Sequence, residues 1–208
     1  MLPKLMYISD GSTPEEHLEN ISKALDAGVK FVQLRLKNMG PSEVLPYAEQ
    51  TNALCKKHNA ILFINDHPQV AQRCGAKGVH VGLDDMPANE VKHRYPQLLI
   101  GGTANTMEHI RLRHQEKVDY IGLGPFRFTS TKEKLSPVLG IQGYKQILDQ
   151  MKAEGIHIPV YAIGGLNLED INHLMQTGVH GIAVSSLINK ASDKPELIQQ
   201  IENRFENA

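Results

Sequence analysis

The chain has 208 residues, of which 41% are hydrophobic and 22% charged, and its formal net charge is −1. This length and apolar content fit a single globular domain spanning residues 1–208 and argue against disorder. No stretch approaches the roughly 20 apolar residues that cross a bilayer, and the near-neutral charge argues against nucleic-acid binding. With two cysteines and no N-terminal pattern typical of a signal peptide, we expect a cytoplasmic protein.

Eight short apolar runs along the chain are predicted strands. Each run is continuous rather than alternating, which is typical of parallel strands buried on both faces. In chain order they are Lys4–Ser9, Phe31–Arg35, Ala60–Asn65, Gly78–Gly82, Leu98–Gly102, Tyr120–Gly124, Pro159–Ile163 and Gly181–Ser185.

The segments between these runs have helical periodicity, with helix-start signals such as Ser12–Glu16 and glycines at 28, 75 and 178 where helices end. Eight strand–helix units in about 200 residues predict a (β/α)₈ TIM barrel. An open, doubly wound sheet is the alternative. The first strand disfavours it, because Ser9–Ser12 contains only one glycine and lacks the dinucleotide-binding fingerprint.

Active sites of such barrels lie at the carboxyl ends of the strands. Gln33, Arg35 and Lys37 alternate at the end of the second predicted strand, so we expect their side chains to share one face. Three polar groups facing a barrel interior favour an anionic ligand. A salt-bridged pair at the barrel rim is the alternative.

Acidic side chains follow the third and fourth predicted strands. Asn65 and Asp66 end the third, and Asp84 and Asp85 follow the fourth. Carboxylates with few other ligand types suit Mg²⁺, which also takes phosphate oxygens. A helix N-cap is the alternative role for either Asp84 or Asp85. Beside Arg35 and Lys37, the acidic residues predict a magnesium–diphosphate site.

Further candidate phosphate ligands follow the last three strands. Thr129, Thr131 and Lys132 lie in the loop after the sixth strand. A mobile polar loop is the alternative interpretation. Gly164–Gly165 and Ser185–Ser186 follow the seventh and eighth, where TIM barrels commonly bind phosphate. Two phosphate sites at one barrel mouth indicate two phosphorylated substrates, joined with loss of diphosphate.

Several segments together resemble the thiamine phosphate synthase family, which also contains the thiazole tautomerase. The resemblance spans nearly the whole chain and rests on the segments 33–37, 65–66, 78–85, 119–125, 129–132 and 162–165. It implies a transferase that joins 4-amino-5-hydroxymethyl-2-methylpyrimidine diphosphate to 4-methyl-5-(2-phosphoethyl)thiazole. The products would be thiamine phosphate and diphosphate, and the reaction would depend on Mg²⁺.

The same resemblance implies roles for individual residues. Arg35, Lys37, Asn65 and Lys132 would hold the diphosphate, while Asp66 and Asp85 would bind Mg²⁺. Gln33 would contact the pyrimidine, and Thr103 stands where the family usually has a serine near the pyrimidine and diphosphate. Ligands of the thiazole phosphate would be Thr129, Thr131, Gly165, Ser186 and the backbone of Ser185. Independently of the resemblance, the proline and lysines of loop 129–139, with Gly140 at its end, make this loop a candidate lid. A homodimer is a candidate assembly.

Two positions depart from the family pattern: Leu83 stands where glutamine is frequent, and Asn105 where histidine is frequent. The tautomerase is the main enzymatic alternative, but it needs a proton-transferring residue near Pro125, and proline carries none. A non-catalytic barrel that binds a phosphorylated ligand is the other alternative. Among the remaining polar residues, we expect His80 to be a hydrogen-bonded interior residue, and Arg113 to lie with Arg111 on a solvated helix face.

Overall fold

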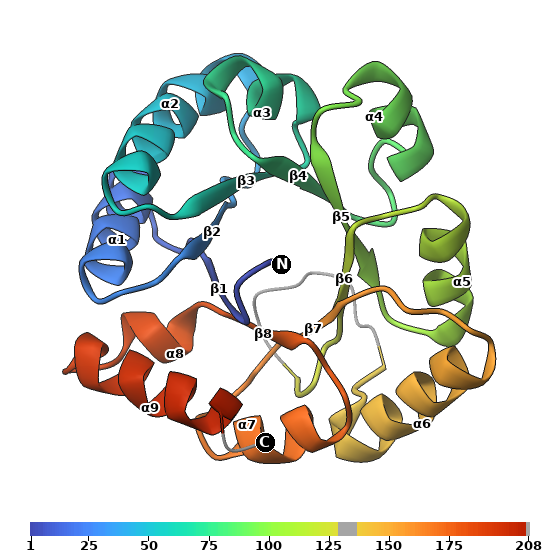
Figure 1. The fold of residues 1–208 in the computed structure, drawn as a ribbon. Helices are drawn as coiled ribbons and strands as arrows, with labels where there is room; N and C mark the ends of the chain where they lie inside the picture. Colours follow the sequence, from blue (N-terminus) through green and yellow to red (C-terminus); the bar gives the residue numbers. More distant parts are fainter. Residues whose placement is uncertain (129–136, 207–208) are drawn as a thin grey trace.

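In the computed structural model, which describes residues 1–128 and 137–206, eight parallel strands close into a barrel in chain order (Figure 1). This confirms the (β/α)₈ prediction over the open sheet, since β1 pairs with β8. The strands are β1 (Leu5–Ile8), β2 (Phe31–Leu34), β3 (Ile61–Asn65), β4 (Gly78–Val81), β5 (Leu99–Ala104), β6 (Tyr120–Leu123), β7 (Val160–Ile163) and β8 (Gly181–Val184).

Helices surround the barrel as an outer ring (Figure 1). They are α1 (Pro14–Asp26), α2 (Pro41–Lys57), α3 (Pro68–Cys74), α4 (Ala88–Arg94), α5 (Met107–Gln115), α6 (Gly140–Ala153), α7 (Asp170–Gln176), α8 (Ser186–Asn189) and α9 (Lys194–Glu206). The start signal before α1 acts as expected, because the Thr13 hydroxyl accepts a hydrogen bond from the Glu16 amide. None of the helices in the described ranges combines the length and apolar character needed to cross a membrane.

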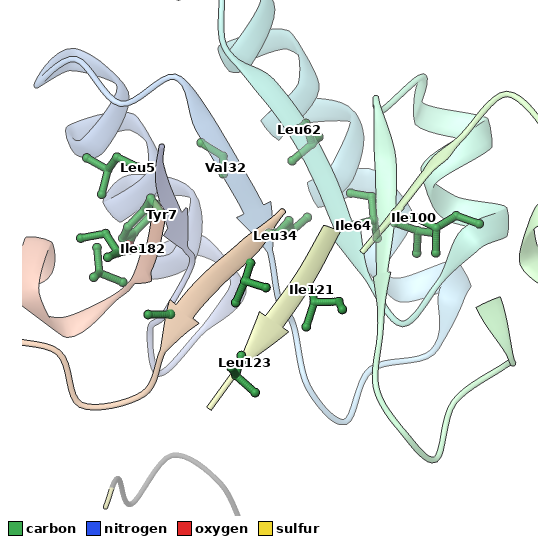
Figure 2. Close-up of a cluster of buried hydrophobic side chains, with 14 of the residues drawn as sticks. Leu5, Tyr7, Val32, Leu34, Leu62, Ile64, Ile100, Ile121, Leu123 and Ile182 are labelled. Carbon is green, nitrogen blue, oxygen red and sulfur yellow. The ribbon is translucent and has the colours of Figure 1, made fainter. Parts of the chain in front are cut away.

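Alternate strand residues point outward and form the larger core, between strands and helices. Figure 2 shows Leu5, Tyr7, Val32, Leu34 and Leu62 among the members of this layer, all of them buried. Because the other alternate residues point into the barrel, each strand is buried on both faces, and the apolar runs in the sequence are continuous.

Aromatic rings fill the lower barrel interior, toward the amino ends of the strands. The rings of Phe31, Phe63, Tyr120 and Tyr161 contact one another with centroids 5.0 to 6.0 Å apart. Gly101 makes room for them, since a Cβ there would lie 2.1 Å from Cζ of Tyr120. The interior is therefore packed at this end, and any cavity must lie toward the carboxyl ends of the strands.

Candidate active site

A cavity of about 490 Å³ lies in the barrel and is lined mostly by residues that end or follow the strands. Most of the sequence-predicted site residues line it, and they come from six different strand ends. These are Gln33, Arg35, Lys37, Asn65, Asp66, Asp85, Thr103, Gly165, Ser185 and Ser186. The other three predicted residues, Thr129, Thr131 and Lys132, lie outside the described residues.

Arg35 brings the positive charge of β2 into the cavity. Its backbone amide donates to the Ser9 hydroxyl at 2.9 Å, and the Ser9 amide donates to the Gln33 carbonyl, so the end of β2 is held against the end of β1. Burial lowers the pKa of the Arg35 guanidinium, while Asp66 and Asp10 oppose that shift. A partly desolvated guanidinium of this kind favours binding of an anion.

Asp66 and Asp85 bring two carboxyl groups into contact on the neighbouring side of the cavity. Asp66 follows β3 with a left-handed φ of 64°, and its amide donates to the His80 carbonyl at 2.9 Å. Burial, together with the hydrogen bond and like charge of Asp85, raises the pKa of Asp66 to about 7. The positive charges of Arg35 and Lys37 lower it only in part.

This carboxyl pair has the donor chemistry of a site for a hard cation. Neither Asp84 nor Asp85 is the N-cap of α4, a position held by Pro87. Instead, Asp85 Oδ2 accepts a hydrogen bond from the Gly82 amide at 2.7 Å. Within residues 1–128 and 137–206, no group of three or more His, Cys, Asp or Glu side chains is arranged to hold a metal. Two carboxylates fit Mg²⁺, which keeps waters and takes phosphate oxygens for its other ligands.

The cavity floor is a chain of hydrogen-bonded side chains from β2, β4, β5 and β6. His80 Nδ1 lies 2.9 Å from the Tyr120 hydroxyl, and His80 Nε2 lies 3.0 Å from Oγ1 of Thr103. Gln33 also bonds the Tyr120 hydroxyl. His80 is therefore a hydrogen-bonded interior residue, as predicted. The network fixes the orientation of polar groups beneath any bound ring.

The loops after β7 and β8 form the opposite wall. Gly164 and Gly165 both adopt left-handed φ values, of 95° and 71°. Arg127 holds this turn, because its amide donates to the Gly164 carbonyl and its guanidinium to the Gly165 carbonyl, both at 2.9 Å. Across the described part of the chain, the buried Oγ of Ser185 finds no hydrogen-bond partner. A buried hydroxyl of this kind is costly unless a ligand satisfies it.

Sequence reasoning missed two residues that line this cavity. Asp10 and Tyr120 line the cavity but were expected only as parts of a loop and a strand. Asp10 is a polar residue directly after the predicted strand Lys4–Ser9, and this is the signal that identified the other site residues. The prediction for Arg113 was wrong: its side chain is 2% exposed and donates to the Thr103 and Gly82 carbonyls, whereas Arg111 on the same helix is 43% exposed.

Comparison with known proteins places these features in a family. The family model for thiamine monophosphate synthase matches residues 5–188. The thiamine-phosphate synthase of Flavobacterium johnsoniae is 49% identical over 99% of this chain and 97% of its own length. The thiamine-phosphate synthase of Bacteroides fragilis is 46% identical over 96% of this chain and 98% of its own length. Among solved structures, the thiamine phosphate pyrophosphorylase from Pyrococcus furiosus matches with a TM-score of 0.85 and 30% identity, over 98% of this chain and 96% of the other.

Proposed function

The chain belongs to the thiamine monophosphate synthase family, and we propose that it joins a pyrimidine diphosphate to a thiazole phosphate to form thiamine phosphate. The observation that carries this proposal is one cavity with two walls whose chemistry suits anions. Arg35 and Lys37 lie beside the carboxyl pair on one side. On the other side lie the Gly165 turn and the Ser185 hydroxyl, which has no hydrogen-bond partner within the described residues. Such a cavity suits two phosphorylated substrates held side by side.

In the reaction, the bond between the pyrimidine methylene carbon and the diphosphate oxygen breaks, and its electron pair leaves with the diphosphate. The thiazole nitrogen then donates its lone pair to the same carbon, forming the carbon–nitrogen bond. Arg35, Lys37 and Asn65 would hold the diphosphate, and the two cations would stabilise the charge that develops on it. Lys132 would do the same from the loop after β6.

Asp66 and Asp85 would hold Mg²⁺, with phosphate oxygens and water completing its coordination. When bound, Mg²⁺ would neutralise negative charge on the diphosphate and so improve it as a leaving group. The raised pKa of Asp66 supports this assignment. Its causes are burial and the neighbouring Asp85 carboxyl, and a bound cation would offset both.

The floor and the opposite wall would position the two rings. Gln33 and Thr103 would orient the pyrimidine, with His80 and Tyr120 fixing both side chains from below. Thr129, Thr131, Gly165, Ser185 and Ser186 would bind the thiazole phosphate. The protein moves no proton in this scheme, so positioning and electrostatic stabilisation carry the rate.

A coupling assay tests the proposal. Purified protein is mixed with both substrates and Mg²⁺, with and without EDTA, and thiamine phosphate is measured by mass spectrometry. We expect equal amounts of thiamine phosphate and diphosphate, formed only when the metal is available. Folded protein that yields no product would contradict the proposal. Turnover of a carboxylated thiazole phosphate would then indicate a tautomerase, and binding without turnover a binding protein.

The sequence-based expectations of a cytoplasmic location and of a homodimer stay predictions. Light scattering coupled to gel filtration measures the assembly directly, and a mass of twice 23.1 kDa would support the dimer.

A further inference from the structure

Arg113 is a buried charge next to the candidate active site. It lies in the last turn of α5 with a side chain that is 2% exposed. Its Nε donates to the Thr103 carbonyl at 3.0 Å, and its Nη2 donates to the Gly82 carbonyl at 2.7 Å. A longer contact of 3.4 Å joins Nη2 to the Val81 carbonyl. One guanidinium thus ties the end of β4 to β5.

Glu116 completes this arrangement. Its Oε2 pairs with Arg113 Nη1 at 2.7 Å, and its Oε1 accepts from the Ala88 amide at 3.1 Å, at the start of α4. The side chain of Glu116 is 8% exposed, so both charges are shielded from water. The pair therefore hydrogen-bonds to both ends of the segment Gly82–Ala88, which contains Asp85.

Gly102 shows that the fold makes room for this guanidinium. A Cβ at Gly102 would lie 2.6 Å from Cδ of Arg113 and 2.7 Å from its Nε. Burying an ion pair is costly, and well-packed apolar residues often stabilise a fold at least as well. A buried pair whose donors go to backbone carbonyls at the cavity rim therefore indicates a positioning role.

We propose that the Arg113–Glu116 pair is a positioning clamp, which sets the loop carrying Asp85 and the β5 end carrying Thr103. Arg113 and Glu116 do not line the cavity. The clamp acts through the backbone, and its catalytic consequence rests on the proposed function. A planar fork of donors suits this task, whereas lysine would place a single ammonium there. Because catalysis depends on sub-ångström placement, loosening the loop lowers turnover.

The test uses Arg113→Ala, Arg113→Lys and the matched control Arg111→Ala, which removes an exposed arginine from the same helix. Two readouts are taken: steady-state kinetics with varied Mg²⁺, and amide hydrogen exchange of the protein without substrates or metal. We expect Arg113→Ala to lower kcat by about 10- to 100-fold. Amides of residues 82–88 exchange faster in this variant, and added methylguanidinium restores part of kcat. Arg113→Lys recovers little, and Arg111→Ala matches wild type in both readouts.

If Arg113→Ala does not fold, Gly102→Ala tests the clamp instead, because the added methyl group displaces the Arg113 guanidinium without removing it from the chain. Exchange at residues 82–88 equal to that of the control, in a folded Arg113 or Gly102 variant, would overturn the clamp. So would unchanged kcat together with an unchanged Mg²⁺ requirement. Absence of turnover in wild type would refute the proposed function instead, and hydrogen exchange would still test the clamp.

Discussion

Asp66 and Asp85 reach each other from the ends of two adjacent strands, and their carboxyl groups are hydrogen-bonded. Burial, and then the hydrogen bond and like charge of Asp85, raise the pKa of Asp66 to about 7, so this contact favours a proton on the pair. In the proposed enzyme, Asp66 and Asp85 would hold Mg²⁺, whose charge would offset the repulsion between the two carboxylates. The two neighbouring carboxyl groups thus lower the stability of the metal-free protein when both are ionised, and the same two groups can bind a cation.

Replacing Asp66 by asparagine separates the effect of the carboxyl pair on stability from its effect on Mg²⁺ binding. Asparagine keeps the shape and tolerates the left-handed φ of 64°, but it removes one charge of the pair. At pH 8 without metal, we expect Asp66→Asn to raise Tm by about 1–4 °C. Turnover with Mg²⁺ falls by about 100-fold or more. Calorimetry and the coupling assay measure the two quantities, with Asp149→Asn on the exposed face of α6 as control. A variant with lower Tm and full activity would refute the charge-pair account.

The stability of the metal-free protein should also depend on pH through Asp66. Its pKa is 3.8 as an ordinary aspartate and about 7 in the folded protein. Between these values the folded state holds a proton that the unfolded state has released, so unfolding becomes easier as pH rises. We expect the free energy of unfolding of wild type, relative to Asp66→Asn, to fall from pH 4 to pH 7 and then level off. Urea titrations at several pH values measure it, and a difference that rises with pH would contradict the shift.

Protons and Mg²⁺ compete for the same carboxyl pair. Mg²⁺ affinity should therefore rise with pH, whereas the stability of the metal-free protein falls. Raising the pH from 6 to 8 should lower the Mg²⁺ concentration needed for half-maximal rate. The same titration on Asp149→Asn should give the wild-type dependence. A half-saturating concentration that does not change with pH would argue against Asp66 as a ligand.

Arg35 is expected to act on the departing diphosphate. Arg35→Ala should lower kcat with the pyrimidine diphosphate by about 100-fold, because it removes a fixed cation from the leaving group. The KM for the thiazole phosphate should change little, since that substrate binds the opposite wall. Steady-state kinetics with each substrate varied in turn separates the two effects. Arg94→Ala, which removes an exposed arginine paired with Glu90, is the control.

Ser185 is expected to act on the other substrate. Its hydroxyl is buried and has no partner in the described residues, so Ser185→Ala should leave the Tm of the free protein unchanged or slightly higher. Losing a hydrogen bond to a charged phosphate should raise the KM for the thiazole phosphate by about 10-fold. The exposed Ser192→Ala is the matched control. An unchanged KM would show that this hydroxyl does not contact the phosphate.

The sequence was sufficient to predict the barrel and most of the cavity residues. Polar residues such as Arg35 and Asp66 directly follow apolar runs, and parallel strands bring all their carboxyl ends to one mouth. Glycines such as Gly75 and Gly178, both with positive φ, end helices where the sequence indicated.

Residues whose role depends on three-dimensional packing could not be predicted in the same way. Arg113 has the spacing of an exposed helical arginine, and only the gap left by Gly102 lets it turn inward. Tyr120 belongs to an apolar run, and its hydroxyl meets His80 only because β4 and β6 both flank β5 in the closed barrel. Such contacts join residues far apart in the chain, so the local sequence pattern cannot predict them.

The most direct test of the account is the Mg²⁺ dependence of product formation in wild type and Asp85→Asn. Initial rates of thiamine phosphate and diphosphate release are measured together over a range of Mg²⁺ concentrations. The account predicts equal release of both products, saturation of wild type, and a requirement for at least about 10-fold more Mg²⁺ in Asp85→Asn. Identical Mg²⁺ curves for the two proteins, or product formed in full after EDTA treatment, would contradict it.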